Sequence, residues 1–346
     1  MKALVKTEPG YNKMELLEIE KPVPKDQEVL VKVIYTGICG TDIHGFKGEY
    51  DRLKTPLVLG HEFSGVVEAV GENVTKVQKG AFVTSETTFD TCGECESCQN
   101  KEYNLCLNRK GLGSQVNGSF AEYVLTREES IHVLDEKISL LAASITEPIA
   151  CGVHASLEKA QVKKDEVAVI VGPGPIGLCL SQVLKSVEAK VIVLGITQDA
   201  ERLKTAKELG ADRVIDSLTE DATAIIKEFT NGKGADYCFE CSGAAPAIKA
   251  IFDYLKQKGT LVQMGVFGKN LNELDMNSIV QREMNIIGSR SQKPSTWHLT
   301  LDLMKQGKID AERLITKIYP LEQWEEAIEQ VMAGNEIKVV LQPNKQ

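Results

Sequence analysis

The chain has 346 residues, of which 42% are hydrophobic and 26% charged, with a formal net charge of −9 and a pI near 5.3. This acidic balance argues against a nucleic-acid or anionic-membrane partner. The amino-terminal segment is charged throughout and no run approaches the roughly 18 apolar residues of a membrane span, so we expect a cytoplasmic protein.

Residues 1–152 contain short strand-like runs such as "EVLVKVIY", "SGVVEAVG" and "FAEYVLT", separated by Gly and Asn, which indicates an irregular β-rich domain. This half carries Cys39 in "GICGTDIHGF" and the pair His61 and Glu62 in "LGHEFSGVVEAVGENV". Thiolate, imidazole and carboxylate together form a plausible zinc set, and three protein ligands with an open position are typical of a catalytic zinc.

Four cysteines follow in the spacing C-x2-C-x2-C-x7-C, namely Cys92, Cys95, Cys98 and Cys106. In a reducing compartment such a cluster indicates metal ligands more than disulfides. The final gap is too long for the ferredoxin-type cluster pattern, and the proline of that pattern is absent after Cys106. Four thiolates close in sequence suit a closed tetrahedral zinc, which is a structural site.

Residues 153–288 alternate between strand-like and helical segments, which predicts a doubly wound parallel sheet of the Rossmann type and hence an α/β fold. Strands are expected at 167–171 and 190–194, and a helical segment at 244–259. The tail, residues 289–346, loses this alternation, and we expect it to return and complete the first domain.

The run "VIVGPGPIG" contains a G-x-G-x-x-G pattern between a predicted strand and a predicted helix, the context that favours dinucleotide binding. The first glycine allows a tight turn, the second lets the backbone approach a pyrophosphate, and the third permits close packing of helix and strand. The predicted contacts in this loop are Gly172, Gly174, Pro175, Ile176 and Gly177.

The choice between NAD and NADP is open. Gly195 ends the second strand of this unit, where an NAD site usually has an acidic residue for the ribose 2′-hydroxyl. Thr197 and Arg202 could contact a 2′-phosphate, and Asp199 is expected further along, on the helix. Gly265 and Val266, after the strand-like "TLVQM", are further predicted cofactor contacts.

Several motifs together resemble one family. "GHEFSGVVEAVGENV" fits the signature G-H-E-x2-G-x5-G-x2-V of zinc-containing alcohol dehydrogenases, and "CGTDIH", the cysteine cluster and the dinucleotide loop occur in the same order. The chain therefore resembles the zinc-dependent medium-chain dehydrogenases over nearly its whole length. Within that family it is similar to the polyol (sorbitol-type) and threonine dehydrogenase branch.

This resemblance implies a GroES-like catalytic domain with one catalytic and one structural zinc. It assigns the catalytic zinc to Cys39, His61 and Glu62, with Glu147 of "TEPIACGVHA" close enough to bind directly or through a water. It further implies a proton relay through Thr41 and His44. A homo-oligomer, either a tetramer or a dimer through the dinucleotide domain, is also implied.

These features predict an oxidoreductase that transfers a hydride between a secondary alcohol and NAD(P), with a polyol or polyol phosphate as its small-molecule substrate. L-threonine 3-dehydrogenase is the alternative enzyme, against which the Glu147–Pro148 pair argues mildly, because threonine dehydrogenases more often have Asp-Pro there. A non-catalytic zinc and dinucleotide-binding sensor or scaffold is the alternative of another class, and that role predicts loss of at least one catalytic-zinc ligand.

Overall fold

The structure, a computed structural model, describes residues 1–50 and 52–345, which divide into two compact units. Unit 1 contains Met1–Glu147, Lys293–Lys305 and Ala311–Gln346, and unit 2 contains Pro148–Gln292 and Gln306–Asp310. The sequence placed the boundaries at 152/153 and 288/289. The short segment 306–310 joins unit 2 because the Gln182 side chain donates to and accepts from the Asp310 backbone.

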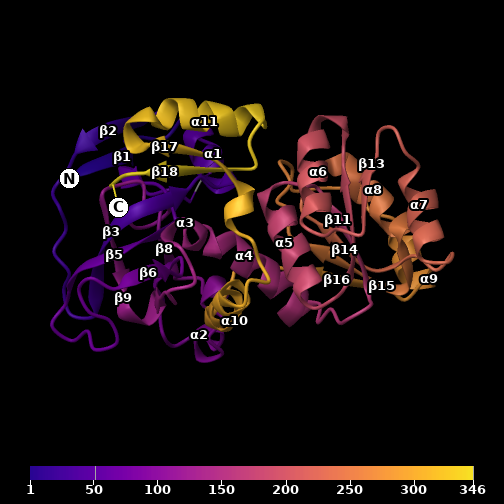
Figure 1. The fold of residues 1–346 in the computed structure, drawn as a ribbon, viewed down its shortest axis with the longest axis horizontal. Coiled ribbons are helices and arrows are strands. Elements are labelled where there is room, and N and C mark those ends of the chain that lie inside the picture. Colours follow the sequence, from indigo (N-terminus) through magenta and orange to yellow (C-terminus); the bar gives the residue numbers. More distant parts are fainter. Residues whose placement is uncertain (51, 346) are drawn as a thin grey trace. The chain divides into compact units, whose positions relative to one another are not determined.

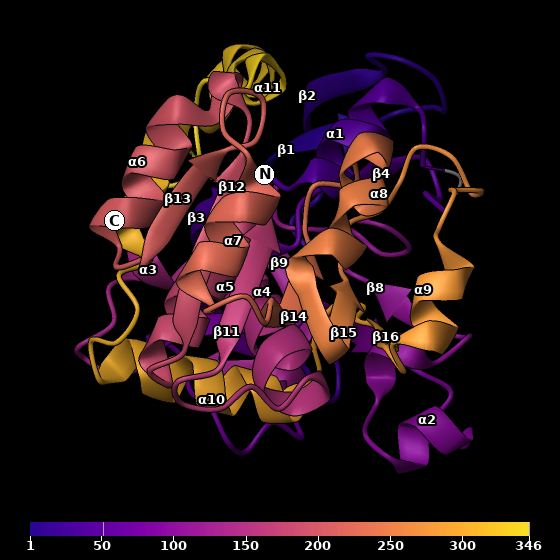
Figure 2. The ribbon, with the colours of Figure 1, turned by 90° about the vertical axis from the view of Figure 1, so that its right-hand side faces the viewer.

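Unit 2 contains a parallel sheet of six strands in the order β13-β12-β11-β14-β15-β16 (Figure 2). This is the 3-2-1-4-5-6 order of the doubly wound dinucleotide-binding fold, and the sequence predicted a sheet of this class. The strands are β11 (Val167–Val171), β12 (Lys190–Gly195), β13 (Arg213–Asp216), β14 (Ala235–Glu240), β15 (Leu255–Gln263) and β16 (Asn285–Gly288). The helices are α5 (Pro175–Ser186), α6 (Ala200–Glu208), α7 (Ala222–Phe229), α8 (Ala245–Tyr254) and α9 (Met276–Gln281).

Helices cover both faces of this sheet because its central strands are apolar on both sides. Val169 and Val171 of β11 pack into one core with Ile226 of α7 and Ile251 of α8. The alternate residue, Ile170, faces the opposite side, where α5 approaches the sheet closely. Continuous apolar strands of this kind are typical of parallel sheets buried on both faces.

The helix predicted at 244–259 is shorter in the structure. α8 ends at Tyr254, and Leu255 already pairs with Ala235 as the first residue of β15. The apolar spacing of the predicted helix continues through Leu255, so the pattern alone could not show where the chain becomes extended. Pairing with β14 determines the end of the helix.

Unit 1 is built from antiparallel and mixed sheets. Its strands are β1 (Lys2–Lys6), β2 (Met14–Glu18), β3 (Glu28–Gly37), β4 (Leu57–Val58), β5 (Glu62–Val70), β6 (Phe82–Ser85), β7 (Thr88–Asp90), β8 (Lys110–Gly111), β9 (Tyr123–Arg127), β10 (Ile131–Val133), β17 (Ile315–Pro320) and β18 (Lys338–Gln342). The helices are α1 (Gly40–Lys47), α2 (Glu96–Gln99), α3 (Leu140–Ala143), α4 (Thr146–Val153), which continues into unit 2, α10 (Pro294–Lys305) and α11 (Trp324–Ala333).

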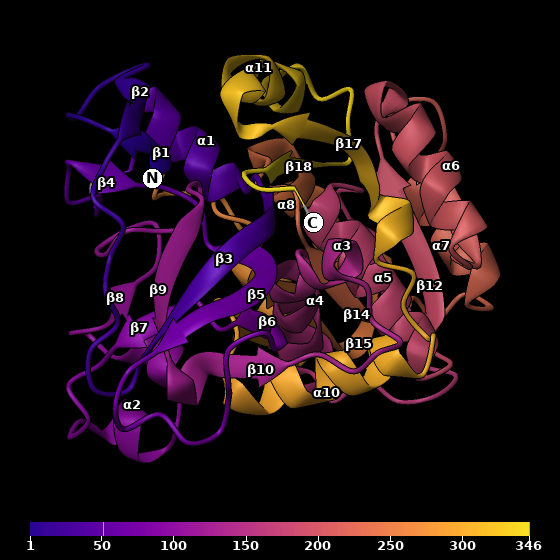
Figure 3. The same ribbon diagram turned by 60° about the vertical axis from the view of Figure 1, so that its left-hand side comes forward.

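The largest sheet of unit 1 joins segments from both ends of the sequence. Its order is β10-β6-β5-β3-β18-β17, and β9 also pairs with β3. The late strand β18 is antiparallel to β3, with Val340 opposite Gly37. Figures 1 and 3 show these yellow return strands next to the indigo strands of the amino-terminal half. Among the described residues, no helix combines the length and apolarity needed to span a bilayer.

Candidate metal centres and dinucleotide site

Cys39 lies at the start of α1, where it is the N-cap residue. Its backbone N–H donates to Oδ2 of Asp42 over 2.9 Å, and the Asp42 N–H is directed back to Cys39. This reciprocal capping pattern satisfies N–H groups that the first helical turn cannot pair. It also fixes the backbone conformation from which the Cys39 thiol projects.

His61 is positioned by the turn that precedes β5. Gly60 has φ +88°, and a Cβ there would lie 2.3 Å from the Phe120 ring, so this turn requires glycine. The Gly60 N–H donates to Oδ1 of Asp42 over 3.1 Å, and Nδ1 of His61 lies 3.6 Å from the same oxygen. A carboxylate beside Nδ1 orients the ring and directs Nε2 toward a metal.

The charges around His61 favour its protonated form when no metal competes. Burial lowers the pKa of His61, but the Asp42 carboxylate, the Cys39 thiol and Glu147 raise it more, and the net pKa lies well above its usual value. The same negative surroundings also attract a metal cation, which replaces the proton and binds the neutral imidazole. Sequence reasoning missed Asp42, although its capping position three residues after Cys39 was visible.

Glu62 is the first residue of β5, and its carboxylate is held by Lys338 of β18. Nζ of Lys338 donates to Oε1 over 2.7 Å, lies 2.6 Å from Oε2, and also donates to the Ile38 carbonyl oxygen over 2.9 Å. Both side chains are buried, with 1% and 4% of their surface exposed. The opposing residue, Gly37, leaves room for this pair, because a Cβ there would lie 2.3 Å from Oε2.

The structure brings Cys39, His61 and Glu62 together, with one ligand atom of each within 4.8 Å of the other two. This donor set suits zinc, which takes Cys, His and carboxylate ligands. Glu147, in the first turn of α4, is buried and close enough for its charge to act on His61. Thr41 is exposed, and its Oγ1 lies 3.8 Å from the Cys39 sulfur.

His44 lies on the exposed face of α1, three residues after Thr41. Its Nδ1 is 2.9 Å from Oε2 of Glu49, and both side chains are more than half exposed. An exposed imidazole beside a carboxylate can exchange a proton with solvent, as an outer relay group must.

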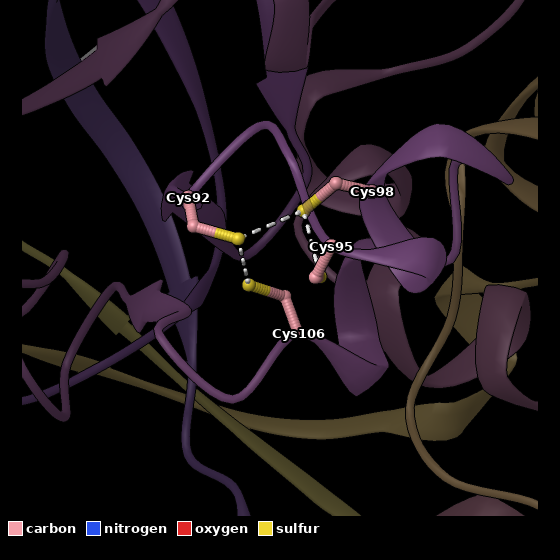
Figure 4. Close-up of side chains that lie close together, drawn as sticks. All are labelled: Cys92, Cys95, Cys98 and Cys106. Carbon is pink, nitrogen blue, oxygen red and sulfur yellow. Dashed lines mark hydrogen bonds between the residues drawn. The ribbon is translucent and has the colours of Figure 1, made fainter.

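The four cysteines of the segment 92–106 converge on one point (Figure 4). The sulfur of Cys98 lies 3.8 Å from that of Cys92 and 3.5 Å from that of Cys95, and Cys106 lies 3.7 Å from Cys92. These thiols are free cysteines. Four sulfurs at about 2.3 Å from a tetrahedral zinc would be about 3.8 Å apart, so the cluster has the dimensions of a closed zinc site.

The glycine-rich loop follows β11 and has the predicted local structure. Gly172 has φ +102°, and a Cβ there would lie 2.9 Å from Cβ of Ser242. A Cβ at Gly177 would lie 2.0 Å from the Gly172 carbonyl oxygen, so α5 packs tightly on the loop. Gly174 is the N-cap of α5 and a Cβ there would meet open space, and Pro175 and Ile176 form the first turn. Open space at a helix N-terminus fits a pyrophosphate.

In the loop after β12, Asp199 ends the short 3₁₀-helix Thr197–Asp199 and is the N-cap of α6, close to the expected position on the helix. Its Oδ2 accepts from the Ile196 N–H over 3.1 Å. A Cβ at Gly195 would lie 3.2 Å from that oxygen, so the Asp199 carboxylate lies beside the expected acidic position. Nη1 of Arg202 lies 3.4 Å from Oδ1 of Asp199.

Thr197 is also held by an acidic residue. Its hydroxyl donates to Oδ2 of Asp216, at the end of β13, over 2.7 Å, and this bond contributes to the lowered pKa of Asp216. The two side chains predicted to contact a 2′-phosphate, Thr197 and Arg202, are therefore each bonded to a carboxylate.

Gly265 and Val266 follow β15 at the same carboxyl edge of the sheet. The buried Glu240 organises this edge, because its carboxylate accepts from the Gly243 N–H over 3.0 Å and from the Gln263 side chain over 2.8 Å. A Cβ at Gly265 would lie 2.3 Å from Oε2 of Glu240, and Val266 is 87% exposed. Ligands of doubly wound folds bind at this edge of the sheet.

Comparison with known proteins identifies two family matches. The family described as "Alcohol dehydrogenase GroES-like domain" matches residues 25–136, and the family described as "Zinc-binding dehydrogenase" matches residues 175–306. The chain is 50% identical to the D-arabitol-phosphate dehydrogenase of Enterococcus avium, over 99% of this chain and 98% of that protein. It is 44% identical to the sorbitol dehydrogenase of Halalkalibacterium halodurans, over 99% of each chain.

More distant relatives include the L-threonine 3-dehydrogenase of Caldanaerobacter subterraneus, at 35% identity over 99% of each chain. Among solved structures, the chain is similar to a protein of Sinorhizobium meliloti 1021 described as a zinc-binding dehydrogenase and bound to NADP, with 30% identity and a TM-score of 0.90. It is also similar to an alcohol dehydrogenase of Escherichia coli CFT073 solved with NADH, with 29% identity and a TM-score of 0.90. Each alignment covers 99% of both chains.

Proposed function

Because the chain belongs to the zinc-binding dehydrogenase family, whose members are oxidoreductases, we propose that it oxidises a secondary alcohol of a polyol or polyol phosphate with NAD⁺ or NADP⁺. The observation that most supports this proposal is that unit 1 contains two candidate metal centres with different ligand sets. One has four thiolates and no place for a substrate, and the other has a sparser set at Cys39, His61 and Glu62.

In this proposal Cys39, His61 and Glu62 hold the catalytic zinc, with Glu147 as a further ligand, direct or through a water. A bound zinc polarises a substrate oxygen and lowers the pKa of a bound hydroxyl. Asp42 keeps the His61 ring oriented, and Lys338 holds the Glu62 carboxylate in place. Four thiolates at Cys92, Cys95, Cys98 and Cys106 would hold the structural zinc.

The chain's own residues must move the hydroxyl proton away. Thr41 is next to the Cys39 sulfur and would accept a hydrogen bond from the substrate hydroxyl. His44 lies on the same helix, exposed and bonded to Glu49, and would pass the proton to solvent. The cofactor accepts the hydride. Gly172, Gly174 and Gly177 would hold its pyrophosphate. The remainder of that site would be bordered by Gly195, Thr197, Arg202, Gly265 and Val266.

The proposed substrate class rests on the sequence identity to the named relatives. The two named polyol and polyol-phosphate enzymes are 50% and 44% identical, whereas the threonine enzyme is 35% identical. L-Threonine is therefore the second candidate substrate. A non-catalytic sensor or scaffold is a weaker alternative, because Cys39, His61 and Glu62 are all present and gathered.

The proposal is tested by measuring zinc per chain and the reduction of NAD⁺ and NADP⁺ with polyols, polyol phosphates and L-threonine. We expect two zinc ions and turnover of a polyol or its phosphate. Cys39→Ser should abolish turnover and leave one zinc bound. Zinc and cofactor binding without turnover of any secondary alcohol would instead support the sensor or scaffold role.

We also propose that two copies associate through unit 2. The last strand of its sheet, β16, is at the edge and exposes 46% of Ile286, and the preceding helix α9 exposes 77% of Val280. An open edge strand beside exposed apolar side chains is a template for pairing with another strand. Ile286→Glu should shift the light-scattering mass toward the monomer, while Leu218→Glu, an exposed position beyond β13, should leave it unchanged.

The cysteines support a reducing compartment, the cytoplasm. None of the nine cysteines forms a disulfide in the described part of the chain, and both candidate metal sites depend on thiolates. Disulfides are rare in such compartments and thiolate-bound metals are stable there. Expressing the protein as a fusion to a fluorescent reporter and imaging the cells would test this location.

A further inference from the structure

We infer that the Glu240 carboxylate places a fixed negative charge behind the nicotinamide end of the cofactor site and thereby favours the oxidised cofactor over the reduced one. This inference rests on the proposed function and adds a positioning residue to it. Glu240 is the last residue of β14, the strand that adjoins β11 in the parallel sheet, and its side chain is fully buried. A buried carboxylate is costly unless other groups compensate its charge, so its surroundings explain its role.

Four donors meet the Glu240 carboxylate. Oε1 accepts from the Ser242 N–H over 2.8 Å and from the Ser242 hydroxyl. The Gly243 N–H lies 3.0 Å from Oε1 and 3.1 Å from Oε2, and the Gln263 amide donates to Oε2 over 2.8 Å. All four groups donate, which suits the ionised carboxylate, because that form only accepts. In the described part of the chain no cation pairs with Glu240, so its negative charge is stabilised but not neutralised.

The same carboxylate lies where three loops of unit 2 converge. Ser242, in the loop after β14, packs against the glycine-rich loop, because a Cβ at Gly172 would lie 2.9 Å from the Ser242 Cβ. In the loop after β15, a Cβ at Gly265 would lie 2.3 Å from Oε2 of Glu240. The Gln263 amide joins that loop to the carboxylate, since it also donates to the Gly265 carbonyl oxygen over 2.7 Å. The charge is therefore directly behind two loops that we assign to the cofactor.

The position of β14 in the sheet indicates which end of the cofactor is near this charge. A dinucleotide lies across the point where the strand order of a doubly wound sheet reverses, with one mononucleotide on each half. The half formed by β11, β12 and β13 carries Gly172 and Asp199, which border the proposed pyrophosphate and adenosine-ribose positions. The half formed by β14, β15 and β16 is left for the nicotinamide, and Glu240 ends the first strand of that half.

The nicotinamide ring is the part of the cofactor whose charge changes. The ring is positive when oxidised and neutral after it accepts a hydride. A fixed negative charge attracts only the positive form, so it strengthens binding of the oxidised cofactor relative to the reduced one. The Glu240 charge acts on a neighbour in the same sense, because burial and this charge raise the pKa of the Cys241 thiol and disfavour a second anion there. In an alcohol oxidation, the bias favours entry of the oxidised cofactor and release of the reduced one.

Two other carboxylates at strand ends of this sheet differ from Glu240. Asp216 ends β13, in the other half of the sheet, where it accepts from the Thr197 hydroxyl over 2.7 Å. Asp236 is near the amino end of β14 and forms an ion pair with Lys256. Glu240 thus combines the carboxyl edge of the nicotinamide half, full burial and a set of neutral donors.

The test measures the dissociation constants of the oxidised and the reduced cofactor separately, by titration calorimetry of the zinc-loaded protein without substrate. Glu240→Gln removes the charge and keeps the size of the side chain. The dissociation constant of the oxidised form, divided by that of the reduced form, should rise on the order of tenfold, as for loss of an attraction between two partly screened charges. Asp253→Asn, at an exposed carboxylate before the first residue of β15 and thus at the opposite edge of the sheet, is the matched control and should leave this ratio unchanged.

Two further variants decide the question if Glu240→Gln does not fold, as judged by circular dichroism and zinc content. Gln263→Lys places an ammonium beside Oε2 and should raise the ratio in the same direction, because it neutralises the charge. Glu240→Asp keeps the charge and should keep the ratio, even where both forms bind more weakly. An unchanged ratio in folded Glu240→Gln, or in Gln263→Lys in its place, would mean that the carboxylate only supports the loops and would overturn the inference. Failure of the wild type to bind either form of the cofactor would overturn the proposed function itself.

Discussion

Glu62 and Lys338 form a buried ion pair although 276 residues separate them in the sequence. The carboxylate begins β5 and the ammonium begins β18, and β3 lies between these two strands in the sheet. The pair is next to the candidate catalytic metal site, since Glu62 is one of the three gathered ligands. Removing one partner leaves a buried charge without compensation, which is far more costly than loss of an exposed pair.

We therefore predict that Lys338→Met lowers the free energy of unfolding by about 3–5 kcal/mol. The measurement is chemical denaturation followed by circular dichroism. Glu62→Gln together with Lys338→Met should lose less than the sum of the two single variants, because the double change removes both charges. Lys2→Met, which breaks the exposed Lys2–Glu322 pair, is the control and should change stability little. Additive losses would show that the pair is not coupled.

The four-cysteine site should contribute stability and not chemistry. Cys98→Ser removes one of four thiolates, so we expect one zinc per chain to be lost and the melting temperature to fall. The folded fraction should keep its kcat within a few-fold. Cys241→Ser, at a cysteine outside both clusters, should keep two zinc ions. Loss of kcat in a Cys98→Ser variant that is otherwise folded would contradict this assignment.

Asp42 should act on the catalytic metal through His61. Asp42→Asn removes the charge beside Nδ1 but keeps the size of the side chain, so we predict a loss of zinc affinity of about 10–100-fold. Competition with a chelator measures this affinity. The structural zinc should be unaffected, which provides an internal control. Equal weakening of both zinc ions would indicate a general loss of structure.

The cofactor preference should depend on Asp199. Its carboxylate is bonded to Arg202 and lies beside Gly195, where it would repel a 2′-phosphate. Asp199→Ser removes this negative charge, so the NADP⁺ to NAD⁺ ratio of kcat/KM should rise about tenfold, which corresponds to ~1.4 kcal/mol. Glu201→Gln, an exposed neighbour on α6, should not change the ratio. A fall in the ratio would place the 2′-position elsewhere.

Asp212 should make the stability of unit 2 depend on pH. Burial raises the pKa of Asp212, but bonds from the Lys185 ammonium and the Val191 N–H lower it more, so the net pKa is below its ordinary value. Its stabilisation is therefore complete above the unfolded pKa near 4 and is lost as pH falls through the folded value.

Asp212→Asn should thus cost about 1 kcal/mol at neutral pH, and the difference from the wild type should shrink in acid. Denaturation curves of both proteins between pH 3 and pH 7 would be compared, with both pH limits chosen to span the ordinary carboxyl pKa near 3.9. Asp253→Asn, at an exposed carboxylate of the same unit, is the control. A constant difference across this range would show that the Asp212 charge is not the cause.

Most of the features predicted from the sequence were predicted from local motifs. The parallel sheet of unit 2 and the tight turn at Gly172 were predicted, because the strand–helix alternation and the glycine spacing are visible in short stretches of the sequence, whereas the order of the strands was not predicted. Lys338 was not foreseen, because its buried partner is distant in sequence and a lysine in an apolar strand is ordinarily exposed. The end of α8 at Tyr254 depends on the pairing of Leu255 with β14, which apolar spacing cannot show.

The placement of β18 beside β3 has a consequence for the order in which the protein forms during synthesis. The six strands of the unit 2 sheet all precede β18 in the sequence, so this sheet can close while β18 is still unmade. Until residue 338 has left the ribosome, the Glu62 carboxylate lacks the Lys338 ammonium that it contacts in the complete structure. The nascent protein is therefore expected to expose this end of β5 until β18 has paired with β3.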